Sequence, residues 1–158
     1  MKKLLCISIL TVASVRIAFA GSSDHQTLQF DVAQVADITL GVSPSFRISD
    51  IPPGGTGSDT KSTTYGISIN DPNPGSIITV NLSDKMPDGT HLYATVTPPA
   101  GAGAAIGAVD LNQTSQTVVQ GIIPVNQTGI AVSYQFTATY AAAPGTFSRD
   151  VFFTLVAK

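Results

Sequence analysis

The stretch that decides the fold is GIAVSYQFTATY, residues 129–140. Apolar or aromatic residues occupy every second position from Ile130 onward, and the residues between them are small or polar. A period of two is the spacing of a β-strand with one buried face, because successive side chains point to opposite sides of a sheet. The stretch therefore predicts a long strand. Its inward residues are expected to be Ile130, Val132, Tyr134, Phe136, Ala138 and Tyr140.

The same alternation recurs on both sides of this stretch, in TYGISIN (64–70), IITVNLSD (77–84), HLYATVTPP (91–99) and FSRDVFFTLVA (147–157). Segments rich in Gly, Pro, Asn and Asp separate these strands, and IPPGGTGSDTKST (51–63) has the composition of a long loop. No run of apolar residues with helical spacing is long enough to predict a helix. The pattern predicts an all-β, antiparallel, immunoglobulin-like β-sandwich of roughly eight to ten strands, with no significant helix after the N-terminal leader. We expect residues 129–140 and 147–157 to form a C-terminal hairpin in its core.

The first 20 residues, MKKLLCISILTVASVRIAFA, have the features of a cleaved signal peptide. Lys2 and Lys3 precede an apolar run, and small residues surround Phe19 before Gly21. We expect cleavage after Ala20 and a single domain over residues 21–158; the alternative is an uncleaved N-terminal anchor. The sequence therefore predicts a secreted protein of the periplasm, cell surface or extracellular space, with no membrane span after cleavage.

The composition narrows the classes of partner. The only cysteine, Cys6, lies in the leader, so the expected mature chain must hold together without disulfides. All ten acidic residues are aspartate, and removing the leader leaves five basic residues against them. So low a basic content argues against binding to nucleic acid or to anionic membranes.

Residues suited to catalysis or to metal binding are few. The two histidines, His25 and His91, show no ligand spacing, and no G-x-S-x-G motif occurs. Aspartates next to turns are explained by side-chain bonds to the backbone. We expect no enzyme and no cofactor; the remaining alternative is a small hydrolase that joins His91 to a hydroxyl and an aspartate.

Two weaker ligand sites can be named. Loops at one end of a sandwich could bring together oxygens suited to calcium, and these candidates are Asp71, Asn73, Asp84 and Asp88. A carbohydrate would need an exposed aromatic ring. Tyr93 falls on the polar face of its strand and is the best candidate, whereas alternation places Tyr65 and Tyr140 in the core.

The segment YQFTATYAAAPGTFSRDVFFTLVA (134–157) resembles the closing strands of small secreted bacterial β-sandwich proteins of the pilin-like and spore-coat-U-like kind. The cysteine pair and the penultimate tyrosine of many such pilins are missing. The resemblance implies an incomplete sandwich that a neighbour's N-terminal strand completes. TLQFDV (27–32) would be that donor, with Leu28, Phe30 and Val32 filling the neighbour's pockets. We favour the simpler alternative that this segment is the domain's own first strand.

Three functions remain open. The first is an exported structural or interaction protein at the cell surface, a fimbrial or adhesion subunit whose partners are other protein subunits. The second is a secreted module that binds carbohydrate or another small ligand, with calcium as an option. The third is the small hydrolase. The lack of a catalytic constellation and the Ser/Thr-rich strand faces favour the first.

Overall fold

The computed structural model describes residues 26–73 and 75–157; the leader expected at residues 1–20 and His25 lie outside them. Within the described residues the chain forms nine strands and no helix, so no helix there is long and apolar enough to cross a membrane. Ala33–Lys158 form one compact unit, and residues 26–32 belong to a separate one. The strands are β1 (Ala36–Leu40), β2 (Thr56–Ile69), β3 (Ser76–Leu82), β4 (Thr90–Val96), β5 (Ala104–Ala105), β6 (Ala108–Asp110), β7 (Gln116–Ile122), β8 (Val125–Thr139) and β9 (Val151–Val156).

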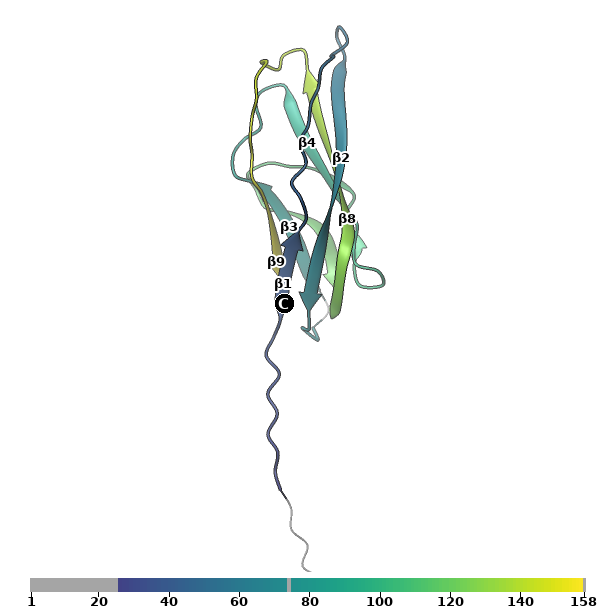
Figure 1. Ribbon diagram of the computed structural model, residues 1–158, viewed down its shortest axis with the longest axis vertical. Coiled ribbons are helices and arrows are strands. Elements are labelled where there is room, and N and C mark those ends of the chain that lie inside the picture. The colour runs from purple at the N-terminus through teal and green to yellow at the C-terminus, as the bar shows by residue number, and fades with distance from the viewer. Residues whose placement is uncertain (1–25, 74, 158) are drawn as a thin grey trace, which may run out of the picture. The chain divides into compact units, whose positions relative to one another are not determined.

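The strands build two antiparallel sheets that pack as a β-sandwich, which confirms the predicted fold class. One sheet has the order β1-β2-β8-β4-β6, and the other has the order β5-β7-β3-β9. Figure 1 shows β2, β4 and β8 in one layer and β3 with β9 in the other. Every strand pair is antiparallel, so each sheet can bury one face and leave the other in water.

The core lies between the sheets and follows the period of two. On β3 and β4 each alternate residue is buried, and on β8 the alternate residues from Ile130 through Ala138 are buried except Phe136, which is partly buried. Tyr140 breaks it, because β8 ends at Thr139 and the Tyr140 ring is 71% exposed; the prediction that it lies in the core was wrong. Tyr65 is buried as predicted, and its hydroxyl donates a 2.7 Å hydrogen bond to the carbonyl of Thr97.

Residues 56–63 form the first half of β2, although their composition predicted a loop. They pair with β8 from Thr56 opposite Thr139 to Thr63 opposite Val132. A register shift at Gly66 interrupts the ladder between Tyr65 and Ile67. Because the ladder satisfies the backbone and the outward side chains are small and polar, the partner strand overrides the weak local preference.

The predicted C-terminal hairpin does not form. β8 belongs to one sheet, whereas β9 pairs with β3 in the other, from Ile77 opposite Val156 to Leu82 opposite Val151. Residues 140–150 therefore carry the chain from one layer to the other, as Figure 1 shows in yellow. Within the alternating stretch 147–157, Val151, Phe153 and Leu155 lie in one phase and face inward, whereas Phe147, in the same phase, lies before the strand and is exposed.

The first strand is β1, and residues 26–35 form no strand. Of the stretch AQVADITL (33–40), only Ala36–Leu40 joins the sheet, beside β2. After β1, residues 41–51 form no ladder of their own but pack inward through Phe46, whose ring lies 6.1 Å from that of Phe136. The Asp59 carboxylate accepts a 2.9 Å hydrogen bond from the backbone N–H of Arg47, and this bond lowers the pKa of Asp59.

Candidate functional site

The edge of the sandwich formed by β9 is the candidate functional site. Within the described residues, β9 pairs with β3 on one side and has no partner strand on the other. Its inward residues Val151, Phe153 and Leu155 are only partly buried, whereas Ile78 and Val80 on the neighbouring β3 are fully buried. The core is therefore incompletely covered along β9.

The outward face of β9 is apolar as well. Phe152 is 50% exposed and Val156 is 40% exposed, so the strand carries large apolar side chains on both faces. β1 ends the other sheet on the same side of the sandwich and contacts β9, and its inward Ile38 is also only partly buried. An open edge of this kind is a template for pairing with another chain.

Two of the other three sheet edges in the described part of the chain are short, with two residues in β5 and three in β6. The third edge, β1, has five residues and carries Asp37, whereas the six residues of β9 include no proline and no charge. Short edge strands and charged or proline residues are the usual means of blocking strand addition. β9 uses none of these means.

The candidate donor residues Leu28, Phe30 and Val32 are all exposed, with Phe30 at 83%. They lie in a segment without strand structure, and no other part of the described chain presents so regular an alternation of exposed apolar residues. Such a segment has the pattern of a strand that buries one face in a partner. The structure does not show it as the domain's own first strand, which was the alternative favoured from the sequence.

The entry to β1 carries a set of contacts that the sequence did not predict. The side chain of Asn70 accepts a 2.6 Å hydrogen bond from the N–H of Val35 and donates one of 2.8 Å to the carbonyl of Ala33. Asp71 is buried and accepts a 3.3 Å hydrogen bond from the amide of Gln34. We call these contacts of Asn70 and Asp71 with residues 33–35 the entry clamp.

The four calcium candidates are not brought together. Asp71 and Asn73 precede β3, whereas Asp84 and Asp88 follow it, so a strand of about 20 Å separates the pairs. The Asp88 carboxylate pairs with Lys85 at 2.8 Å, which lowers the pKa of Asp88 and raises that of Lys85. No cluster of three or more His, Cys or acidic residues suited to a metal occurs among the described residues.

Tyr93 lies on the outer face of the sandwich, as predicted, and is partly exposed. The ring of His91 stacks on it, with centroids 6.0 Å apart and an interplanar angle of 21°. His91 Nδ1 lies 2.9 Å from the Asp110 carboxylate. These two groups have the spacing of a base and an acid that orients it, but within residues 26–73 and 75–157 no Ser or Thr hydroxyl bonds to the imidazole.

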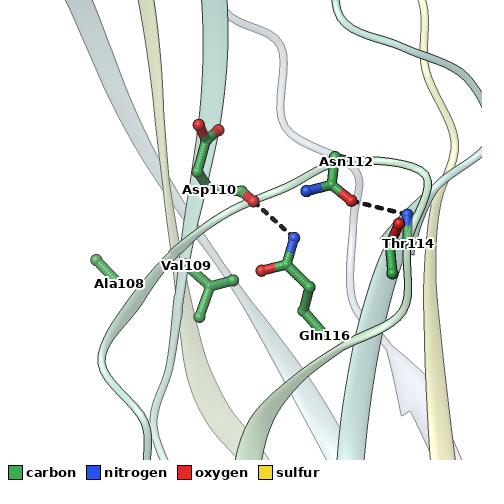
Figure 2. Close-up of a pocket in the computed structure, with 6 residues that line it drawn as sticks. All are labelled: Ala108, Val109, Asp110, Asn112, Thr114 and Gln116. Atoms are coloured by element: carbon green, nitrogen blue, oxygen red, sulfur yellow. Dashed lines mark hydrogen bonds between the residues drawn. The ribbon is translucent and has the colours of Figure 1, made fainter.

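A shallow, open depression of about 660 Å³ adjoins Asp110. Its lining consists of Ala108, Val109, Asp110, Asn112, Thr114 and Gln116. Figure 2 shows that its polar groups bond to one another, Gln116 to the Asp110 carbonyl and Asn112 to the N–H of Thr114, while the Asp110 carboxylate points away. Groups already satisfied in this way do not converge on a ligand.

Comparisons with known proteins leave the site to be interpreted from its geometry. The chain matches no protein-family model, and the search of curated proteins found no significant relative.

Proposed function

We propose that this protein is an exported structural subunit whose β9 edge accepts a strand from another subunit. The observation that carries the proposal is the unpaired edge of β9, six residues without proline or charge, with its partly buried inward residues. The strand that fits best is the segment of residues 27–32 of a second copy. Its inward side chains Leu28, Phe30 and Val32 would then cover Val151, Phe153 and Leu155.

The chemistry of the two surfaces supports this assignment. Backbone N–H and C=O groups on the open side of β9 supply binding energy, and alternate side chains supply specificity. Phe30 alone buries enough apolar area to contribute about 2–3 kcal/mol. Between these apolar residues, which we call the plugs of the segment (Leu28, Phe30 and Val32), lie Gln29 and Asp31, which would face water. A period of two on the donor thus matches a period of two on the acceptor.

The experiment that tests the proposal compares the exported protein with a variant that lacks residues 21–32, by size-exclusion chromatography with light scattering. We expect oligomers of the full protein and folded monomers of the truncated one. A synthetic peptide of residues 26–34 should then bind the truncated monomer. A full-length monomer that unfolds on truncation would instead make the segment the domain's own first strand.

A second candidate function is the binding of a neutral carbohydrate on the outer face, and the Tyr93–His91 stack favours it. Aromatic faces offer a flat apolar surface with polar groups at the rim, and Asp110 supplies an acceptor beside His91. Retention on immobilised polysaccharides, lost in Tyr93→Ala and kept in Tyr140→Ala, would support it. Tyr140 is a matched control because it is an exposed tyrosine outside the strands.

A further inference from the structure

The entry clamp bears on whether the donor segment, residues 27–32, reaches the β9 edge of its own subunit or that of a second copy. We propose that Asn70 and Asp71 act as positioning residues that prevent the segment from adding to the β9 edge of its own subunit and so direct it to a second copy. This inference rests on the proposed function. The contacts that carry it lie within residues 33–35 and the body of the sandwich.

The argument begins with the direction of the strands. β1 begins at Ala36 opposite Ile69, near the end of β2, and runs toward Leu40 opposite Tyr65. β9 ends at Val156, which lies opposite Ile77 at the start of β3, a few residues after the end of β2. The beginning of β1 and the end of β9 are therefore at the same end of the sandwich, and the two strands contact each other; Figure 1 shows their labels one above the other.

This geometry restricts how the subunit could use its own segment. Residues 27–32 are joined to that end of the sandwich through residues 33–35, so to lie along β9 they would have to run back beside β1. The chain would then reverse direction within residues 33–35. The strand formed on β9 would also run parallel to it, which is the slightly weaker form of pairing.

The clamp opposes that reversal. The N–H of Asn70 donates a 3.2 Å hydrogen bond to the carbonyl of Val35, and the Asn70 side chain bonds to Val35 and to Ala33. These bonds continue the line of β1 beyond Ala36, with the Asn70 amide taking the place of a further backbone partner. Asp71 secures the same three residues through Gln34. A reversal within residues 33–35 would break this set, whereas donation to a second copy leaves it intact.

Asp71 is suited to this task because it is held rigidly. It is 2% exposed, and its second oxygen accepts a 2.9 Å hydrogen bond from the N–H of Asn73. A buried carboxylate with two partners fixes the turn that carries Asn70. Asn70 and Asp71 therefore form a rigid set of hydrogen-bonding groups that holds residues 33–35 at the start of β1.

Crosslinking distinguishes the two destinations. Cys6 is the only native cysteine, so a Cys6→Ser background accepts two new ones without ambiguity. Gln29→Cys lies on the face of the donor opposite its plugs, and Thr154→Cys lies on the exposed face of β9. A short bis-maleimide reagent would join them in the full-length protein. Within one chain it gives a crosslinked monomer, and between copies it gives a ladder on a denaturing gel.

We expect a ladder when the clamp is intact. Asn70→Ala should shift the ratio of intramolecular to intermolecular product by about tenfold, because two side-chain hydrogen bonds are lost. Asn70→Asp keeps the acceptor for Val35 and loses the donor for Ala33, so it gives a smaller shift and guards against a misfolded alanine variant. Asn112→Ala is the matched control, since Asn112 also bonds to the backbone but in a distant loop.

The outcomes separate the two proposals. A ladder that Asn70→Ala and Asn70→Asp leave unchanged, in proteins that unfold cooperatively, would overturn the role of the clamp and leave strand donation standing. No crosslink in any variant would overturn strand donation itself. A crosslinked monomer with the clamp intact would show that the subunit completes itself, and both proposals would then fail.

Discussion

Replacing one plug of the donor segment gives the sharpest test of strand addition. Phe30 is 83% exposed in the isolated chain, so Phe30→Asp removes no packing from the free subunit. In the assembled state the change would forfeit about 2–3 kcal/mol of apolar burial and would place a carboxylate against the apolar side chains of β9. Assembly should therefore weaken by at least about 100-fold. Thermal unfolding of the monomer should stay unchanged.

The matched control is Gln29→Asp, which adds the same charge one residue away on the face that would lie in water. It should change assembly by less than about 0.5 kcal/mol, as exposed substitutions usually do. Light scattering over a dilution series measures both variants, and calorimetry measures the monomers. Equal weakening by the two changes would refute the reasoning, because a simple charge effect would then be enough. A lower melting temperature of monomeric Phe30→Asp would show that Phe30 packs within its own domain.

Three further predictions concern the body of the sandwich. Gly89→Ala should destabilise the fold by about 2–4 kcal/mol in chemical denaturation, because Gly89 has φ +77° and a Cβ there would lie 2.8 Å from the N of Ala142. Gly101→Ala, with φ +70° and open space, should cost only about 1 kcal/mol. Asp59→Asn should lower the protection factor of the Arg47 amide in hydrogen exchange. In the wild type the same protection factor, corrected for the intrinsic exchange rate at each pH, should fall as the pH drops through the depressed pKa of Asp59, because the bond is then weakened. Burial raises the pKa of Tyr65 to about 12, whereas the pKa of a tyrosine in the unfolded chain is about 10. The free energy of unfolding should therefore fall as the pH rises from about 10 to about 12, and it should fall less in Tyr65→Phe. An identical alkaline profile in that variant would show that Tyr65 is not the group that titrates.

The sequence predicted the faces of strands better than their partners. Alternation depends on residues two positions apart, so Ile130, Val132 and Tyr134 were placed in the core correctly from local pattern alone. The pairing of β9 with β3 depends on residues far apart in the chain, about which local pattern is silent. One feature of the sequence does argue against a simple hairpin with one apolar face. Phe152 and Phe153 are adjacent, so the strand carries an apolar ring on each face instead of alternating.

The candidate site was predicted only in part. Leu28, Phe30 and Val32 could be named from their spacing, but the edge that would accept them could not, because edges follow from sheet order. No motif in the sequence predicts a role for Asn70. The Asn70 side chain contacts Ala33 and Val35, which lie far from it in the chain, and no local pattern around residues 33–35 or residue 70 predicts that they pair.

The open edge of β9 affects the stability of the protein, because a strand that binds there would bury apolar side chains of the core. No disulfide can form within a chain that has a single cysteine, so the sandwich depends on its core and its sheets. The core is least complete along β9, where Phe153 and Leu155 are only partly buried. A strand that adds there would stabilise the fold by mass action, and the melting temperature would rise with protein concentration. If the clamp at Asn70 keeps each subunit's segment of residues 27–32 away from its own β9, an isolated subunit is expected to be the least stable form of the protein. The apolar burial that would complete the fold would then also drive assembly.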